Sequence, residues 1–408
     1  MQPSTALLFA LAAPAAALTA SERADLTSEL DMWKASEAGK IAAQEGFMPS
    51  VRGLVGAAAE EVELVRFQAT KATVAQLNKD HPDATFTLDN PWVLLTDDEF
   101  AAFVRGGAGG RLATESNTTS VDLTAAQLEA GDKDWTGHKC LSPVRNQGTC
   151  GSCWAFAATG AVESAHCLAT GTLMDFSEQQ LVSCAHNAGH GCGGGWPSRA
   201  LDFVFNTGFC TDVSFPYTGR DDACRSCEKT KVAVGPTVNV RGEGALQTAI
   251  DAQPASVMVE AANGVWRNYN SGVVRRCPGA QSDHVVLAVG YGSKGGVDHF
   301  KIKNSWGSRW GEGGYMYLER GGGGRGMCNV ADSVSYPKLQ SKPTPNPSPK
   351  PKPTKKPSPT PSKDVCADCS GCYYPAKRQC LEDDERYDED FCTHNADVFG
   401  TVWCGPSN

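Results

Sequence analysis

The placement of the cysteines constrains this chain more than any other feature of its sequence. All seventeen lie after residue 125, and the last six fall within residues 364–408. So many thiols are rare in a reduced cytosolic protein without metal clusters, so we expect an oxidising compartment and a fold held by disulfides. Because seventeen is an odd number, at least one cysteine stays unpaired and is available for chemistry.

The N-terminus supports the same compartment. Residues 6–17 form an apolar run of signal-peptide length, and Ala15, Ala17 and Ala20 supply small residues for cleavage. We therefore predict a signal peptide at 1–20 and a secreted or lysosomal (vacuolar) protein. No other stretch approaches the roughly eighteen apolar residues of a membrane span. The net charge of −9 disfavours nucleic acid as a partner.

Changes in composition divide the rest of the chain into four parts. Residues 21–125 contain no cysteine, and apolar residues recur at helical spacing over 60–78. Residues 126–338 are helical in their first half and strand-rich in their second, which predicts an α+β fold of two lobes. Residues 339–363 form a Pro/Lys-rich extended linker. The module at 364–408 is too small for a strong core, so its six cysteines indicate disulfides.

One stretch in the globular part, Gln147–Phe156, brings reactive residues together. Its sequence is Gln-Gly-Thr-Cys-Gly-Ser-Cys-Trp-Ala-Phe, and Cys153 begins an apolar, helix-prone run. The positive end of a helix dipole beside this thiol is expected to favour the thiolate. The Gln147 amide is placed to donate to an oxyanion beside it. A second interpretation stays open, in which Cys150 and Cys153 form a redox or metal-binding pair.

A cysteine nucleophile needs a base, and the base needs a group that orients it. His284 lies 131 residues after Cys153, at the start of a strand pattern between Gly-rich turns. The next strand pattern leads to Asn304, whose amide can hold the imidazole, and Trp306 can shield that contact from water. The sequence therefore predicts one catalytic site from Cys153, His284 and Asn304.

These motifs together resemble the papain-like cysteine peptidases, and the cathepsin L-like subgroup in particular. The segments that carry the resemblance are Asp134-Trp135, 146–156, 177–184, 191–197, Asp283-His284 and 304–307. The resemblance implies a two-lobed fold, with a helical left lobe and an antiparallel, β-barrel-like right lobe. It also implies a monomeric cysteine endopeptidase that acts on proteins or peptides with no cofactor and no bound metal.

The resemblance also implies residue roles. Cys153 and His284 would form a thiolate–imidazolium pair, with Asn304 orienting the imidazole. Gln147 and the Cys153 N–H would bind the oxyanion. The alternative is a binding protein that keeps this fold without activity, and it is disfavoured because all four residues are present.

Residues 21–125 resemble the inhibitory propeptide of the same family, which occludes the cleft until it is removed. They carry part of its long-helix motif, with Thr70 where asparagine is usual. An unrelated helical domain is the alternative for this part of the chain.

The family's common disulfides also map onto this chain. Cys150 would pair with Cys192, Cys277 with Cys328, and Cys184 with either Cys224 or Cys227. The partners of Cys140, Cys167, Cys210 and the remaining member of 224/227 stay open, because connectivity is not readable from sequence.

The main specificity pocket of the family corresponds to Trp196, Pro197, Met258, Val285 and Ser333. These residues predict an apolar pocket without a carboxylate at its base. A hydrophobic or aromatic substrate residue two positions before the cut is therefore expected. We see no inserted loop that would block the cleft, which favours an endopeptidase over an exopeptidase.

Two surface features complete the sequence-based expectations. Tyr373, Tyr374 and Trp403 in the C-terminal module either stack on a polysaccharide or form the module's small core, and both interpretations stay open. A tethered module favours a targeting role, with residues 364–408 binding the polysaccharide. Asn117, in Asn-Thr-Thr, is a plausible N-glycosylation acceptor.

Overall fold

The computed structural model describes residues 18–49, 56–106, 119–340, 372–374, 379–381 and 402–404. The chain divides into two compact units, 1–342 and 343–408, and each is described by itself. The apolar run of the predicted signal peptide, Asn117 and most of the predicted linker lie outside the described residues. None of the described helices is long and apolar enough to cross a bilayer.

The N-terminal part of the first unit is helical, as expected. Its elements are α1 (Ala20–Ala35), α2 (Glu37–Gln44), α3 (Ala57–Asp80), β1 (Ala84–Phe86) and α4 (Asp97–Arg105). The predicted helix at 60–78 lies inside α3, where Phe67 packs against Trp33 of α1 with 6.5 Å between ring centroids. α4 begins at a capping box in which the Thr96 hydroxyl and the Glu99 carboxylate accept each other's backbone N–H.

The first half of the globular part folds around one buried helix. The elements are α5 (Ala125–Leu128), β2 (Lys133–Asp134), α6 (Cys153–Thr170), α7 (Glu178–Cys184), η1 (Gly191–Gly193), α8 (Pro197–Thr207), β3 (Phe209–Cys210) and β4 (Lys229–Thr230). Fourteen of the eighteen residues of α6 are buried, so this helix is enclosed on nearly every side. α8 starts with Pro197 at its first position, where the missing N–H costs nothing.

The second half forms the sheet lobe. Its elements are β5 (Val234–Val240), α9 (Glu243–Ala252), β6 (Ala255–Val259), α10 (Gly264–Asn268), β7 (Tyr269–Val274), β8 (His284–Lys294), β9 (Val297–Lys303), β10 (Tyr315–Glu319), η2 (Met327–Asn329) and β11 (Val334–Leu339). In the described residues the strand order is β1-β7-β10-β9-β8-β6-β11-β5, with β2 beside β8. All pairs are antiparallel except β7 with β10, which is parallel.

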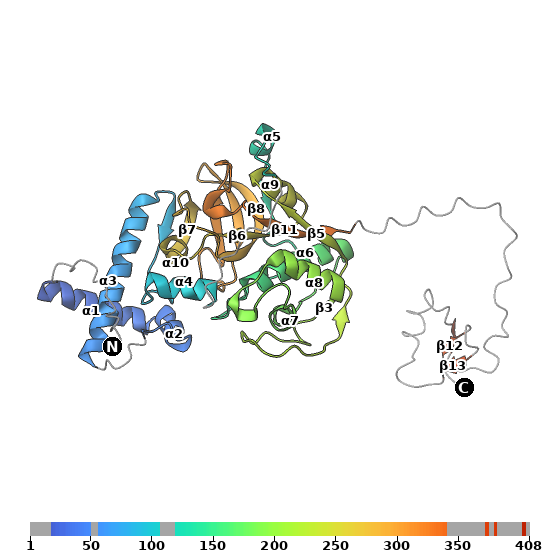
Figure 1. The fold of residues 1–408 in the computed structure, drawn as a ribbon, viewed down its shortest axis with the longest axis horizontal. Helices are drawn as coiled ribbons and strands as arrows, with labels where there is room; N and C mark the ends of the chain where they lie inside the picture. Colours follow the sequence, from blue (N-terminus) through green and yellow to red (C-terminus); the bar gives the residue numbers. More distant parts are fainter. Residues whose placement is uncertain are drawn as a thin grey trace, which may run out of the picture. The chain divides into compact units, whose positions relative to one another are not determined.

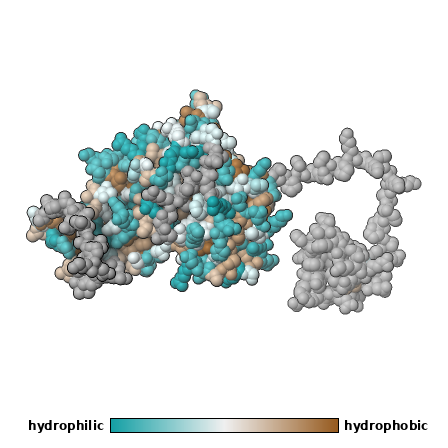
Figure 2. All heavy atoms as spheres, in the orientation of Figure 1, coloured by the Kyte–Doolittle hydropathy of each residue, from teal (hydrophilic) through white to brown (hydrophobic). Residues whose placement is uncertain are grey.

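The two lobes meet where α6 lies on the sheet. A Cβ placed on Gly160 of α6 would lie 3.0 Å from Leu287 Cδ2 on β8, so the small residue allows the close approach. The α+β fold with a helical lobe and a sheet lobe is confirmed. In Figure 1, α4 lies between the blue helices α1–α3 and the rest of this unit. Figure 2 shows a largely hydrophilic surface on the visible face, with small separate hydrophobic areas.

Five disulfides staple the peptidase part within the described residues. They are Cys140–Cys167, Cys150–Cys192, Cys184–Cys224, Cys210–Cys227 and Cys277–Cys328. The three predicted pairings are present, and the open choice for Cys184 is resolved in favour of Cys224. Cys153 is the free cysteine of this part. Because Cys150 is bonded to Cys192, the Cys150–Cys153 redox or metal-binding pair is excluded.

The second unit contains a small antiparallel sheet. Its described strands are β12 (Cys372–Tyr374), β13 (Gln379–Leu381) and β14 (Val402–Trp403), in the order β13-β12-β14. Cys380 and Cys404 are disulfide-bonded, as expected for a stapled module. The side chains of Tyr374 and Trp403 lie outside the described set.

Candidate active site

Cys153 occupies the first position of α6, where its side chain is 4% exposed. Its sulfur accepts hydrogen bonds from the backbone N–H groups of Trp154 and of Val285, the second residue of β8. Ser152, the N-cap residue, makes no side-chain cap bond to the helix, because its hydroxyl pairs with the Tyr217 hydroxyl at 2.6 Å. The start of α6 therefore presents the thiol and its own amide to the start of β8.

His284 begins β8 and is fully buried. Its Nε2 lies 2.8 Å from Asn304 Oδ1, and that oxygen also accepts from the Ser305 N–H at 2.8 Å. Since a backbone N–H can only donate, the amide oxygen faces the imidazole, so Nε2 carries the ring proton. The other nitrogen, Nδ1, has no hydrogen-bond partner among the described residues. Trp306 stacks on the ring with centroids 4.8 Å apart.

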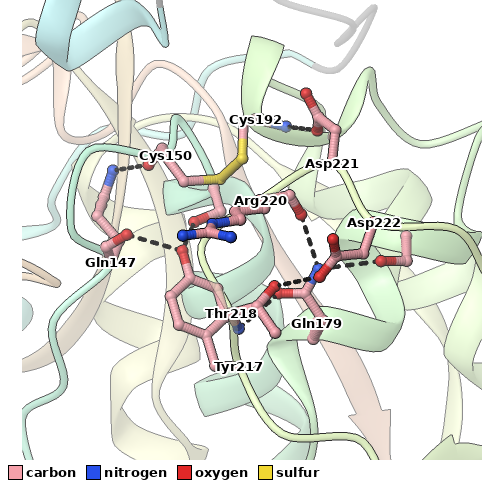
Figure 3. The surroundings of a disulfide bond; sticks show 12 residues. Gln147, Cys150, Gln179, Cys192, Tyr217, Thr218, Arg220, Asp221 and Asp222 are labelled. Atoms are coloured by element: carbon pink, nitrogen blue, oxygen red, sulfur yellow. Dashed lines mark hydrogen bonds between the residues drawn. A yellow bond between two sulfur atoms is a disulfide. The ribbon is translucent and has the colours of Figure 1, made fainter.

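Gln147 ties the loop before α6 to the loop after β9. Its backbone N–H donates to Ser305 O at 2.8 Å, and its Oε1 accepts from the Ser305 hydroxyl at 2.6 Å. Its Nε2 donates to Cys150 O at 2.9 Å, which uses one of the two amide hydrogens. Figure 3 shows Gln147 beside Cys150, at the Cys150–Cys192 disulfide. The second amide hydrogen is left for a ligand of the cleft.

The five predicted pocket residues are divided between two cavities. Four of them line one small cavity together with three polar residues: Trp196, Pro197, Met258, Ser333, Ser198, Asn239 and Ser335. Val285 is the cross-strand neighbour of Met258 but lines a separate cavity behind the site, next to Phe156 and Asn304. The residues around the first cavity carry no carboxylate. Hydroxyl and amide groups nonetheless make this cavity less apolar than expected.

Burial controls the ionisation of the two reactive groups in this state. It raises the pKa of the Cys153 thiol to about 12, against the opposing effect of nearby backbone N–H groups. It lowers the pKa of His284 to about 4, and the Asn304 hydrogen bond offsets this only in part. The backbone N–H groups at the start of α6 do lower the pKa of the thiol, in the expected direction, but by less than burial raises it. Loss of water outweighs the dipole, and both groups are neutral near pH 7.

The N-terminal part packs over this site and adds to its burial. Phe100 and Phe103 of α4 pack on Trp306, with ring centroids 5.9 and 5.8 Å away. At the end of α4, Arg105 Nη2 lies 3.2 Å from the carboxylate of Asp283, the neighbour of His284. β1 adds a strand to the sheet by pairing with β7.

Gly106 then crosses the start of α6. A Cβ at this position would lie 2.2 Å from Cys192 O and 2.9 Å from the Cα of Gly151. With φ at +72°, the position also favours glycine for its backbone conformation. The chain thus passes directly over the disulfide next to Cys153.

A profile of the papain family cysteine protease matches residues 130–338, just over half of the chain. This chain belongs to the papain family of cysteine proteases. Digestive cysteine proteinase 2 from Homarus americanus is 38% identical over 297 residues, which cover 70% of this chain and 91% of that relative. The predicted papain-like cysteine endopeptidase is confirmed.

Solved structures of papain family proforms match more of this chain than its peptidase part alone. The Amb a 11 cysteine protease, a ragweed pollen allergen, is 28% identical in its proform, with a TM-score of 0.62 over 78% of this chain and 95% of that one. Digestive procathepsin L 3 from Tenebrio molitor larval midgut is 29% identical, with a TM-score of 0.61 over 74% of this chain and all of that one. The structure of this papain family protease is therefore that of a zymogen, in which α1–α4 belong to the inhibitory propeptide.

Sequence reasoning missed several residues of this papain-type site. Tyr217 and Ser152 had no catalytic signature, and their contact with the Gln147 loop arises only in the folded chain. Asp283 was assigned no role, yet its Oδ1 accepts from the Ala261 N–H at 2.8 Å and its Oδ2 faces Arg105. A buried carboxylate next to the base is a feature that only burial and contacts reveal.

Proposed function

We propose that this protease cleaves peptide bonds through a covalent thioester on Cys153, with His284 as acid and base. The observation that carries the proposal is the free thiol at the start of α6, beside the start of β8. There Asn304 fixes the proton of His284 on Nε2 and leaves Nδ1 as the basic atom. This arrangement supports proton transfer from sulfur to nitrogen once the propeptide leaves.

The steps follow from these atoms. The Cys153 proton moves to Nδ1, and the thiolate attacks the substrate carbonyl, so that a C–S bond forms and the oxygen becomes an oxyanion. The imidazolium then donates its proton to the amine nitrogen as the C–N bond breaks. Water, deprotonated by His284, hydrolyses the thioester and restores the thiol.

The developing oxyanion needs donors that are already in place. We propose the second Nε2 hydrogen of Gln147 and the Cys153 N–H for this role. Gln147 is fully buried and held at both ends of its amide, by Cys150 and Ser305, so it need not reorganise during the reaction. An inactive binding protein would have no use for this fixed donor, which disfavours that alternative.

The pocket composition supports a preference for hydrophobic or aromatic residues two positions before the cut. Trp196, Pro197 and Met258 supply apolar walls, and the lining residues carry no carboxylate to pair with a cation. The processed enzyme should therefore hydrolyse a Phe-Arg dipeptidyl amide with kcat/KM about tenfold or more above an Arg-Arg amide. A Ser333→Glu variant should narrow that ratio by improving Arg-Arg hydrolysis. A wild-type preference for Arg-Arg would contradict the proposed pocket.

We further propose how the precursor is organised and handled. A signal peptide at 1–20 directs it to secretion or to a lysosomal or vacuolar compartment, with Asn117 as a glycan acceptor. The propeptide at 21–125 leaves the peptidase part, 126–338, as a monomer. This proposal draws on the disulfides and on the apolar N-terminal run.

The C-terminal module is proposed to tether the enzyme to polysaccharide. Tyr373 lies in the central strand of the small sheet and keeps part of its side chain exposed, as a stacking surface requires. The full chain should be retained on insoluble cellulose or chitin more strongly than a chain that ends at residue 341. Equal retention of the two on both polysaccharides would contradict the tethering role.

A further inference from the structure

The hydroxyl of Tyr217 lies between two segments that flank the reactive thiol. It is 2.7 Å from the backbone carbonyl of Gln147 and 2.6 Å from the hydroxyl of Ser152. Gln147 carries the proposed oxyanion donor, and Ser152 directly precedes the second donor, the Cys153 N–H. One phenol therefore bonds to both segments that supply these donors.

The direction of the two hydrogen bonds is fixed by chemistry. A carbonyl only accepts, so the single Tyr217 proton goes to Gln147 O, and the Ser152 hydroxyl must donate to the phenol oxygen. Burial raises the pKa of Tyr217 well above its usual range, so the phenol keeps its proton at any working pH. The link from Ser152 through Tyr217 to Gln147 is therefore permanent and directional.

Tyr217 is itself held by a ring contact and through the residues that follow it in the chain. Its ring packs edge-on against Phe156 of α6, with centroids 4.9 Å apart. Gln179 of α7 is fully buried, and its amide accepts from Thr218 N at 2.9 Å and donates to Arg220 O at 2.8 Å. Figure 3 shows Tyr217 with its hydroxyl toward Gln147 and the Gln179 amide against the chain that follows. The loop thus offers the hydroxyl from a rigid support.

Three further contacts hold the loop that follows Tyr217, and one of them reaches the Cys150–Cys192 disulfide. The Asp221 carboxylate accepts from the Cys192 N–H at 2.6 Å, and Cys192 is bonded to Cys150. The Thr218 hydroxyl donates to Asp222 at 2.7 Å, and Cys224 anchors the end of the loop to α7 through Cys184. The first contact thus links the loop through Cys192 to Cys150, within the segment from Gln147 to Cys153, and the other two brace the loop itself.

We propose that Tyr217 is a positioning residue of the oxyanion hole, which holds Gln147 and the first turn of α6 in register with each other. The inference rests on the proposed function, because it presumes that Gln147 and the Cys153 N–H bind the oxyanion. Tyr217 touches no reacting atom and acts through these two segments. Loss of the link would let the donors drift, and drift of fractions of an ångström weakens oxyanion binding more than substrate binding.

Tyr217→Phe tests this inference, because the ring and its contact with Phe156 are kept while the hydroxyl is lost. In the processed enzyme, kcat for a dipeptidyl amide should fall by about three- to tenfold with KM changed by less than about twofold. The inhibition constant of a peptide aldehyde, which forms an oxyanion on the thiol, should rise by a similar factor. The rate at which iodoacetamide alkylates Cys153 should stay within about twofold, since alkylation makes no oxyanion.

Tyr291→Phe is the matched control, because it also removes one hydroxyl bond, 2.6 Å to Asp251, toward the other end of β8 from His284. It should leave kcat and the aldehyde constant unchanged. Wild-type kcat and aldehyde binding in Tyr217→Phe would overturn the inference, as would an equal loss of alkylation rate. The Gln147→Ala variant separates the role of Tyr217 from the proposed function. If Gln147→Ala lowers kcat and Tyr217→Phe does not, only the role of Tyr217 fails. If Gln147→Ala retains wild-type kcat, the oxyanion assignment itself fails.

Discussion

Replacing Cys153 with alanine is expected to abolish peptide hydrolysis, with kcat lower by about 10⁴-fold or more. Cys153 is the free cysteine of the described peptidase part, so no other thiol there can take its place. Alanine removes the sulfur without crowding the buried start of α6. The variant should be processed with an added protease and assayed on a dipeptidyl amide.

Cys153→Ser is the matched control for this result. It keeps a nucleophilic atom at the same position but replaces a thiol by a far less acidic alcohol, so activity should also be lost. Thermal unfolding of both variants should stay close to that of the wild type, because neither alanine nor serine is larger than the cysteine it replaces at this buried position. Hydrolysis by Cys153→Ala at a rate near that of the wild type would show that another group is the nucleophile.

His284→Ala should produce the second largest loss, a fall in kcat of roughly 10³-fold. Without the imidazole, the thiol has no base and the leaving amine has no acid. The Asn304 amide contacts the edge of the imidazole, and the Trp306 ring contacts its face. Neither group can accept the thiol proton in place of His284.

The pH profile distinguishes a lost base from a damaged fold. The wild-type processed enzyme should be active over a pH range bounded by the two apparent pKa values of the Cys153–His284 pair. The His284→Ala variant should instead gain activity as rising pH ionises the thiol. Asn304→Ala is the matched control: the imidazole stays but loses its orientation, so a smaller fall of about ten- to a hundredfold is expected. Near wild-type turnover by His284→Ala would remove His284 from the mechanism.

Local motifs made much of this protein predictable. Cys153 at a helix start, Pro197 at the first position of α8 and the Thr96–Glu99 capping box all follow from residues close in sequence, and all are present. The resemblance to a family then placed three disulfides. The pairings Cys140–Cys167 and Cys210–Cys227 needed the fold, because several partners satisfy the same spacing.

What the sequence missed depends on contacts between distant segments. The neutral thiol of Cys153 results from burial under the propeptide, which a local dipole argument leaves out. Val285 is the cross-strand partner of Met258 on the same face of the sheet, yet it lines another cavity than the other four predicted pocket residues, which depends on how the neighbouring segments pack. Tyr217 lies seventy residues after Gln147, and only the folded loop brings its hydroxyl to that carbonyl.

Latency in this zymogen has two physical sources. The propeptide occupies the approach to Cys153 at Gly106, and it also keeps water from the pair. We expect removal of α4, whose Phe100 and Phe103 pack on Trp306, to return water to Cys153 and His284. The pKa of the thiol then falls and that of the imidazole rises, which is the direction needed for an ion pair.

Alkylation of Cys153 before and after propeptide removal tests this account most directly. Zymogen and processed enzyme should be treated with iodoacetamide at pH 5 to 6, and the modified residue identified by peptide mass spectrometry. We predict labelling of Cys153 alone, at a rate about a hundredfold or more higher in the processed enzyme, with activity lost in step. Loss of activity through modification of another residue, or equal labelling of Cys153 in both forms, would contradict the account.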